Sequence, residues 1–111
     1  EFIYHDMITH VAMATNPETL LTKKIVSVLE GFGCFTCKYH ASGFTPAGIP
    51  DLIVIRGGVT VWLEIKTPTG SLSKIQEHRH MQMRRYGALI ATVRSPEAAL
   101  EFVSEHCPKN T

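Results

Sequence analysis

Two acidic residues are placed by a predicted β-hairpin where they could hold a cation. Two apolar runs, DLIVI and VTVWLEI, are separated by RGG, and a Gly-Gly pair between β-branched runs is a strong hairpin signal. A two-residue turn pairs Arg56 with Val59 and so sets Asp51 opposite Glu64, with facing Cβ atoms roughly 4.5–5.5 Å apart. Carboxylates this close repel each other unless a cation lies between them.

A lysine extends the pair into a charged cluster. Lys66 follows Glu64 by two residues and therefore points to the same face of the strand. Alternation places Ile53, Ile55 and Trp62 on that face as well, which predicts apolar surroundings. We therefore expect the cluster at the end of the sheet, beside a core.

Glu18 offers a third carboxylate. It precedes Leu21 and Ile25 by three and seven residues, which predicts a place on the buried stripe of a first helix. Carboxylate ligands in this number suit Mg²⁺ or Mn²⁺ rather than zinc. The alternative is three ordinary placements: an Asp at a strand start, an exposed Glu–Lys pair, and a Glu favoured by the helix dipole.

The charge is unevenly distributed along a chain of 111 residues with a net charge of +1. Residues 65–94 hold six Lys or Arg and one acid, whereas the remainder holds five basic and nine acidic residues. Such a basic segment suggests nucleic-acid binding, and a solvated basic helix is the alternative. The composition, 44% hydrophobic and 19% charged, excludes a disordered or collagen-like chain. The apolar runs are too short for a membrane span.

Three cysteines are too few for a disulfide-stapled secreted domain, which predicts an intracellular, reducing compartment. The spacing Cys34-x-x-Cys37-x-x-His40 has a zinc-like rhythm but no second pair of ligands, so we expect small core residues here. No signal peptide is recognised at the start. Residues 1–15 are set apart as an N-terminal extension, expected to derive in part from cloning, with Met13 as a candidate native start.

The remaining elements follow from capping and periodicity. Helices are predicted from Pro17 to about residue 32, from Ser73 to about Tyr86, and from Pro96 to about His106. Strands are predicted over 34–40, over both arms of the hairpin, and over 88–93. This α-β-β-β-α-β-α order indicates one α/β or α+β domain over 16–111, with a sheet covered on both faces.

Three motifs in this order resemble a known family. Three segments are similar to the virus-type replication-repair nuclease (VRR-NUC) family of the PD-(D/E)XK superfamily: GIPDLIV, the strand WLEIK, whose Glu64 follows Asp51 after twelve intervening residues, and LSKIQ at the start of a helix. The resemblance covers roughly residues 17–95. It implies a restriction-endonuclease-like αβββαβ core, a mixed sheet flanked by helices, here followed by a C-terminal helix.

The resemblance also implies metal-dependent hydrolysis of phosphodiester bonds. Asp51 and Glu64 match the metal-binding acids, Lys66 the motif lysine, and Glu18 the acid of the first helix. Mg²⁺ or Mn²⁺ would be held by Asp51, Glu64 and the carbonyl of Ile65, with Glu18 reaching the ion through water. It would polarise a phosphate oxygen and activate a water molecule.

The helix after the hairpin leaves two questions open. Gln76 matches the glutamine that follows the family motif, but it also fits a capping box with Ser73. The basic residues of this helix either contact DNA phosphates or form a solvated face. They are Lys74, Arg79, His80, Arg84 and Arg85.

The expected function is a structure-selective DNA endonuclease of replication, recombination or repair. Small members of the family resemble Holliday-junction resolvases, which implies a homodimer acting on four-way junctions in the cytoplasm of a bacterial or phage-infected cell. A non-catalytic DNA-binding module and a phosphoesterase of small nucleotides are the alternatives.

Overall fold

The computed structural model describes residues 16–111, so the expectations for the extension at 1–15 lie outside the described part. Seven elements follow one another in the predicted order, and the bounds differ from the predicted ones by a few residues at most. They are α2 (Pro17–Gly31), β1 (Phe35–Lys38), β2 (Leu52–Arg56), β3 (Val59–Ile65), α3 (Lys74–Arg85), β4 (Ile90–Val93) and α4 (Pro96–His106).

The four strands form one mixed sheet in the order β1-β2-β3-β4. β1, β2 and β3 are antiparallel, whereas β4 runs parallel to β3 after the α3 crossover. Arg56 pairs with Val59 and Leu52 with Leu63, so the predicted register of the hairpin is confirmed. Gly57 and Gly58 make its turn with φ of 58° and 80°, a conformation that glycine adopts without strain.

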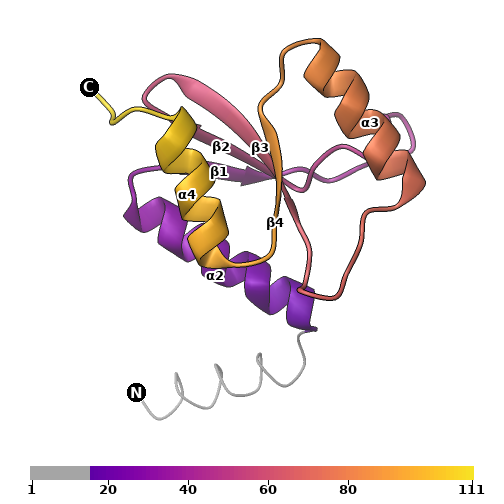
Figure 1. Cartoon of the computed structure of the whole chain (residues 1–111), viewed down its shortest axis with the longest axis horizontal. Helices are drawn as coiled ribbons and strands as arrows, with labels where there is room; N and C mark the ends of the chain where they lie inside the picture. Colours follow the sequence, from indigo (N-terminus) through magenta and orange to yellow (C-terminus); the bar gives the residue numbers. More distant parts are fainter. Residues whose placement is uncertain (1–15) are drawn as a thin grey trace.

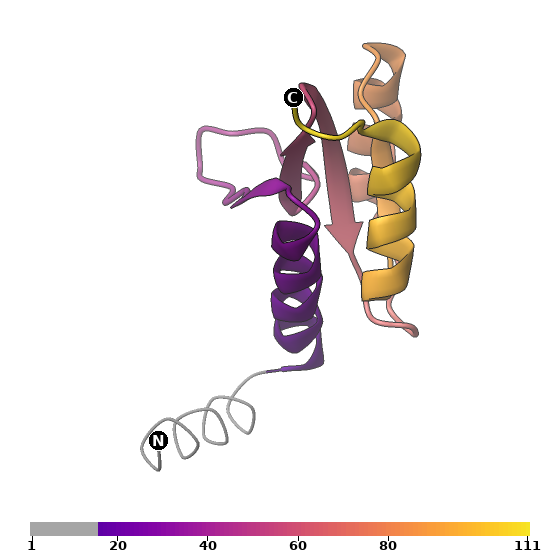
Figure 2. The same cartoon turned by 90° about the vertical axis from the view of Figure 1, so that its left-hand side faces the viewer.

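One face of the sheet carries the hydrophobic core. α2 packs against β1 and β3, and α4 against β3 and β4. The two helices lie side by side on this face (Figures 1 and 2). The core combines fully buried strand residues such as Val61 and Leu63 with Ile25 and Leu29 of α2 and Val103 of α4.

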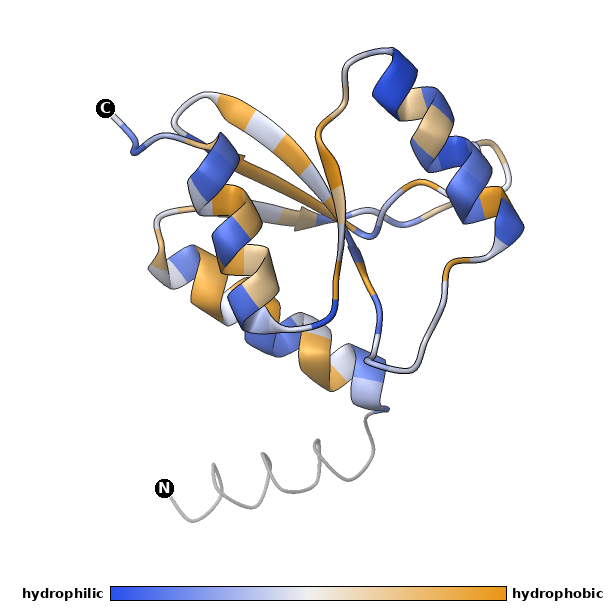
Figure 3. Ribbon diagram, viewed as in Figure 1, coloured by the Kyte–Doolittle hydropathy of each residue, from blue (hydrophilic) through white to orange (hydrophobic). Residues whose placement is uncertain are grey.

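The predicted mixed sheet flanked by helices is confirmed, but α3 covers the opposite face only in part (Figure 1). α3 lies on this side (Figure 1) and is largely hydrophilic (Figure 3). Its one fully buried residue is His80. Ile55 and Thr60 of the hairpin are exposed, and Trp62 is half-buried. With so few apolar residues, α3 cannot provide a second hydrophobic layer.

Each helix begins at a side-chain cap. Asn16, Ser73 and Ser95 accept hydrogen bonds from the backbone N–H groups of Thr19, Gln76 and Ala98. These caps satisfy N–H groups that lack a partner within the helix. The helix starts predicted from Pro17 and Pro96 are thereby explained.

Gly48 brings the loop before β2 against α3. Its φ is 82°, and a Cβ atom added there would lie 2.6 Å from the carbonyl oxygen of Ile75 and 3.0 Å from the Cβ of Arg79. The Nε of Arg79 donates to the carbonyl oxygen of Ala47 at 2.8 Å, which holds the same loop. The loop and helix are therefore in direct backbone contact beside Asp51.

Within residues 16–111, no helix has the length and apolar character required to cross a membrane.

Candidate active site

The hairpin brings Asp51 and Glu64 together as its register predicts. Asp51 directly precedes β2, and the observed pairing of Leu52 with Leu63 continues to Asp51 opposite Glu64. The Oδ2 of Asp51 accepts a hydrogen bond from the backbone N–H of Ile65 at 3.1 Å, which ties its carboxylate to the end of β3. The two acids thus lie at one end of the sheet.

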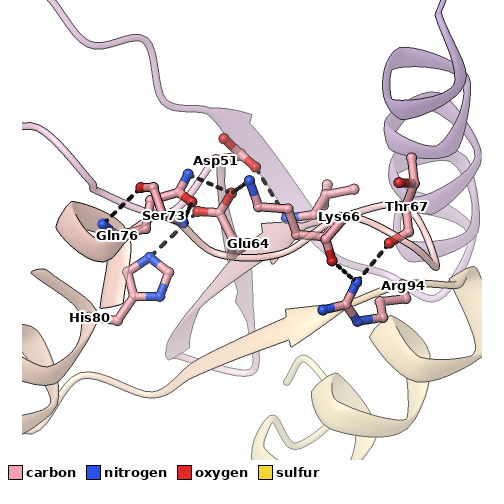
Figure 4. Close-up of polar contacts among 10 residues, drawn as sticks. Asp51, Glu64, Lys66, Thr67, Ser73, Gln76, His80 and Arg94 are labelled. Atoms are coloured by element: carbon pink, nitrogen blue, oxygen red, sulfur yellow. Dashed lines mark hydrogen bonds and ion pairs between the residues drawn. The ribbon is translucent and has the colours of Figure 1, made fainter. Parts of the chain in front are cut away.

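Three side chains surround the Glu64 carboxylate (Figure 4). The Nε2 of Gln76 donates to Oε2 at 3.3 Å, and the Nζ of Lys66 lies 3.7 Å from the same oxygen. The Nε2 of His80 lies 3.4 Å from Oε1. Glu64 and His80 are each 1% exposed and Lys66 is 15% exposed, so α3 closes this end of the sheet over the carboxylate.

The buried carboxylate holds its proton more tightly than an ordinary glutamate. The pKa of Glu64 is raised from 4.5 to about 8, chiefly by burial and in addition by the hydrogen bonding and charge of Asp51, while the charge of Lys66 opposes both. The Oε1 atom is buried and has no hydrogen-bond partner in the described chain. Such a carboxylate is costly to ionise unless a cation compensates it.

Gln76 forms the predicted capping box and also contacts the Glu64 carboxylate. Its Oε1 accepts from the backbone N–H of Ser73 at 2.9 Å, and the Oγ of Ser73 accepts from the N–H of Gln76 at 3.2 Å. This capping box fixes the amide so that its NH₂ group faces Glu64. The start of α3 and the charged site therefore share one side chain.

His80 corrects an expectation. Its side chain is buried, so it cannot join Arg84 in an exposed phosphate-binding face. Burial lowers the pKa of His80, the charge of Arg84 lowers it further, and Asp51 partly opposes them, which favours a neutral imidazole at pH 7. The spacing of four residues between Gln76 and His80 could have identified it, because such residues share a helix face.

Glu18 corrects a second expectation. It is exposed in the first turn of α2 rather than buried on its apolar stripe, which runs through Thr22, Ile25 and Leu29. Together with Asp51 and Lys38 it lines a polar cavity of about 220 Å³ between the start of α2 and the end of β1. Glu18 is thus near the acids but outside the buried cluster.

The donor set limits which ions would fit. No group of three or more His, Cys, Asp or Glu side chains in residues 16–111 is arranged to hold a metal. This includes the cysteines with the zinc-like spacing, of which Cys34 is buried and Cys37 is exposed. Two carboxylates, one with an unpartnered oxygen, still favour a hard divalent cation. Mg²⁺ typically uses one or two carboxylates and completes its shell with water and phosphate. The residues present fit such an ion.

Comparisons with known proteins place the fold. No protein-family model and no curated protein matches the chain. A solved structure described as a VRR_NUC domain superposes with a TM-score of 0.69 at 26% identity, covering 83% of this chain and 98% of that one. The chain is thus similar in fold, and in part in sequence, to a VRR-NUC domain. A second structure, described as a VRR_NUC domain protein, shares the fold with a TM-score of 0.61 at 17% identity, covering 78% of this chain and 86% of that one.

The basic residues of α3 differ in how far they are free to contact a ligand. Lys74 and Arg85 are exposed on α3. Arg84 is also exposed, but its Nη2 donates to the carbonyl oxygen of Ile90 at 3.0 Å, and half-buried Arg79 holds the loop at Ala47. Lys74 and Arg85 are therefore better placed to contact a ligand than the two arginines between them.

Arg94 has a structural role that its sequence position does not reveal. Its Nη1 donates to the carbonyl oxygen of Thr67 at 2.7 Å and to that of Gly70 (Figure 4). Both carbonyls belong to the loop that connects β3 to α3. Arg94 therefore anchors the segment that follows Lys66.

Proposed function

We propose that this nuclease-type VRR-NUC domain is a divalent-metal-dependent endodeoxyribonuclease. The observation that carries the proposal is the pairing of half-buried Asp51 with fully buried Glu64, which has an unpartnered oxygen and a pKa raised to about 8. An uncompensated arrangement of this kind is costly to the fold, and such costs concentrate at functional sites. A bound cation would offset the charge of both acids.

Asp51, Glu64 and the backbone carbonyl of Ile65 are the proposed ligands of Mg²⁺ or Mn²⁺, with Glu18 reaching the ion through water. When bound, the ion supplies Lewis-acid polarisation of the phosphate and a more acidic water. Lys66 lies beside Oε2 of Glu64, and its ammonium group would neutralise charge that develops on the phosphate. Gln76 holds the Glu64 carboxylate in place from α3.

DNA is the proposed substrate. Lys74 and Arg85 are exposed on α3, the helix whose buried side contacts Glu64, so they would hold a DNA backbone next to the helix that covers the site. Phosphate contacts carry little sequence information, which favours recognition of DNA shape. A four-way junction cut by a two-fold symmetric homodimer is the specific form of this proposal.

Cleavage of labelled four-way, flap, nicked and linear DNA with Mg²⁺, with Mn²⁺ and with EDTA tests the proposal. We expect metal-dependent nicking that Asp51→Ala or Glu64→Ala reduces by about 100-fold or more, with DNA binding retained, because removing one charge-stabilising group costs roughly that much. Glu97→Ala, on α4, is the matched acidic control. Full cleavage by either site variant would refute the assignment, and turnover of free nucleotides alone would refute the substrate.

A further inference from the structure

His80 is an unusual residue to bury in this position. Its side chain is 1% exposed, and neither Nδ1 nor Nε2 has a hydrogen-bond partner within the described residues. Oε1 of Glu64 lies 3.4 Å from Nε2, and that oxygen is also unpartnered. Buried polar atoms without partners are rare in proteins and call for an explanation.

The two oxygens of Glu64 are approached from different directions. Oε2 accepts from Gln76 and lies near Lys66, whereas Oε1 is approached by His80. Gln76 and His80 are four residues apart on α3 and therefore act from one helix face. Rotation of the carboxylate about its terminal bond moves both oxygens, so contacts at Oε2 and Oε1 together restrict that rotation more than the contacts at Oε2 alone.

We infer that His80 is a positioning residue that fixes the orientation of the Glu64 carboxylate for cation binding. This inference rests on the proposed function, because it assigns His80 a role at the same metal site. If the imidazole N–H at Nε2 is directed to Oε1, side chains of α3 contact both carboxylate oxygens and together fix the plane of the carboxylate. Partners that orient metal ligands in this way commonly change metal affinity or activity by about 10- to 100-fold when removed.

Three variants separate positioning from packing. His80→Phe keeps a ring in the buried site but removes both nitrogens. His80→Gln keeps an amide N–H near the position of Nε2, and His80→Asn keeps one near Nδ1. His78→Phe is the matched control, because His78 lies two residues away on the exposed side of the same helix.

The first measurement is titration of Mn²⁺ into the metal-free protein by calorimetry at constant pH. We expect His80→Phe and His80→Asn to weaken Mn²⁺ binding by about 10- to 100-fold, with His80→Gln and His78→Phe within a few-fold of the wild type. The second measurement is cleavage, in which His80→Phe should lower kcat and leave KM for DNA within about two-fold of the wild type, because the substrate contacts are unchanged.

The outcomes distinguish this inference from the proposed function. Mn²⁺ binding and cleavage by His80→Phe at wild-type levels would overturn the inference and leave the nuclease proposal standing. Full retention by His80→Asn with loss by His80→Gln would also overturn it, even where His80→Phe does not fold. A wild-type protein that neither binds Mn²⁺ nor cleaves DNA would overturn both.

Discussion

The two faces of the sheet have different purposes. On the face covered by α2 and α4, Leu52, Val54 and Leu63 are fully buried in an apolar core. On the face toward α3, Trp62 is half-buried and Ile55 is 37% exposed, and the buried part is the polar group around Glu64. One face therefore supplies most of the stability, which allows the other face to hold a destabilising charged cluster.

The largest expected effect is on the core face. Leu63→Ala should lower the free energy of unfolding by about 2–5 kcal/mol, because it leaves a cavity in a packed interior. Thr60→Ala, at an exposed position of the same strand on the other face, should change it by less than about 0.5 kcal/mol. Urea denaturation measures both. Equal losses would show that the two faces contribute alike.

The second effect concerns pH and the site face. Because the pKa of Glu64 is raised in the folded chain, its favourable contribution is complete below pH 4.5 and is lost as pH rises to about 8. The metal-free protein should therefore lose stability across this interval, and Glu64→Gln should lose less and be the more stable protein at pH 8. Urea unfolding in EDTA at pH 5 and pH 8 measures the difference. A wild-type protein more stable than Glu64→Gln at pH 8 would contradict the burial cost.

Two serine caps offer a matched comparison of the helices on opposite faces. Ser73→Ala and Ser95→Ala should each cost about 1 kcal/mol of stability, since each removes one N-cap. We expect Ser73→Ala also to reduce cleavage severalfold, because its partner Gln76 contacts Glu64. Ser95 caps α4 on the core face, so cleavage by Ser95→Ala should remain unchanged once the protein is folded. Thermal melts and cleavage rates test this pair.

The smallest effect is on the charged surface of α3. Lys74→Ala should weaken DNA binding modestly and reduce the slope of log affinity against log salt by about 1, the value for one lost phosphate contact. Lys24→Ala, on the exposed surface of α2, is the control and should leave the slope unchanged. Fluorescence anisotropy over a range of NaCl concentrations measures both slopes. An equal change in both variants would mean that α3 does not define the DNA-binding surface.

The local features of this protein could be predicted from its sequence. A tight glycine turn fixes the hairpin register, so Asp51 could be placed opposite Glu64 before the structure was known. The capping box of Ser73 and Gln76 depends on residues three apart and could be identified in the same way.

The burial of individual side chains against the sheet was harder to predict from the sequence. Glu18 is exposed because the axis and rotation of α2 depend on how the helix packs against the sheet, which residue spacing defines only approximately. His80 is buried because α3 meets the end of the sheet at Glu64, a contact set by the crossover between β3 and β4. A basic helix by itself does not reveal which of its faces turns inward.

Because Gly48 has no side chain, the loop before β2 can approach α3 closely enough to form the site. With a carbonyl oxygen of α3 only 2.6 Å from where a Cβ would lie, any other residue would push the helix outward. That displacement would move Gln76 and His80 away from Glu64 together. The hydrogen atom that Gly48 carries in place of a side chain thus determines how close α3 lies to the Glu64 carboxylate.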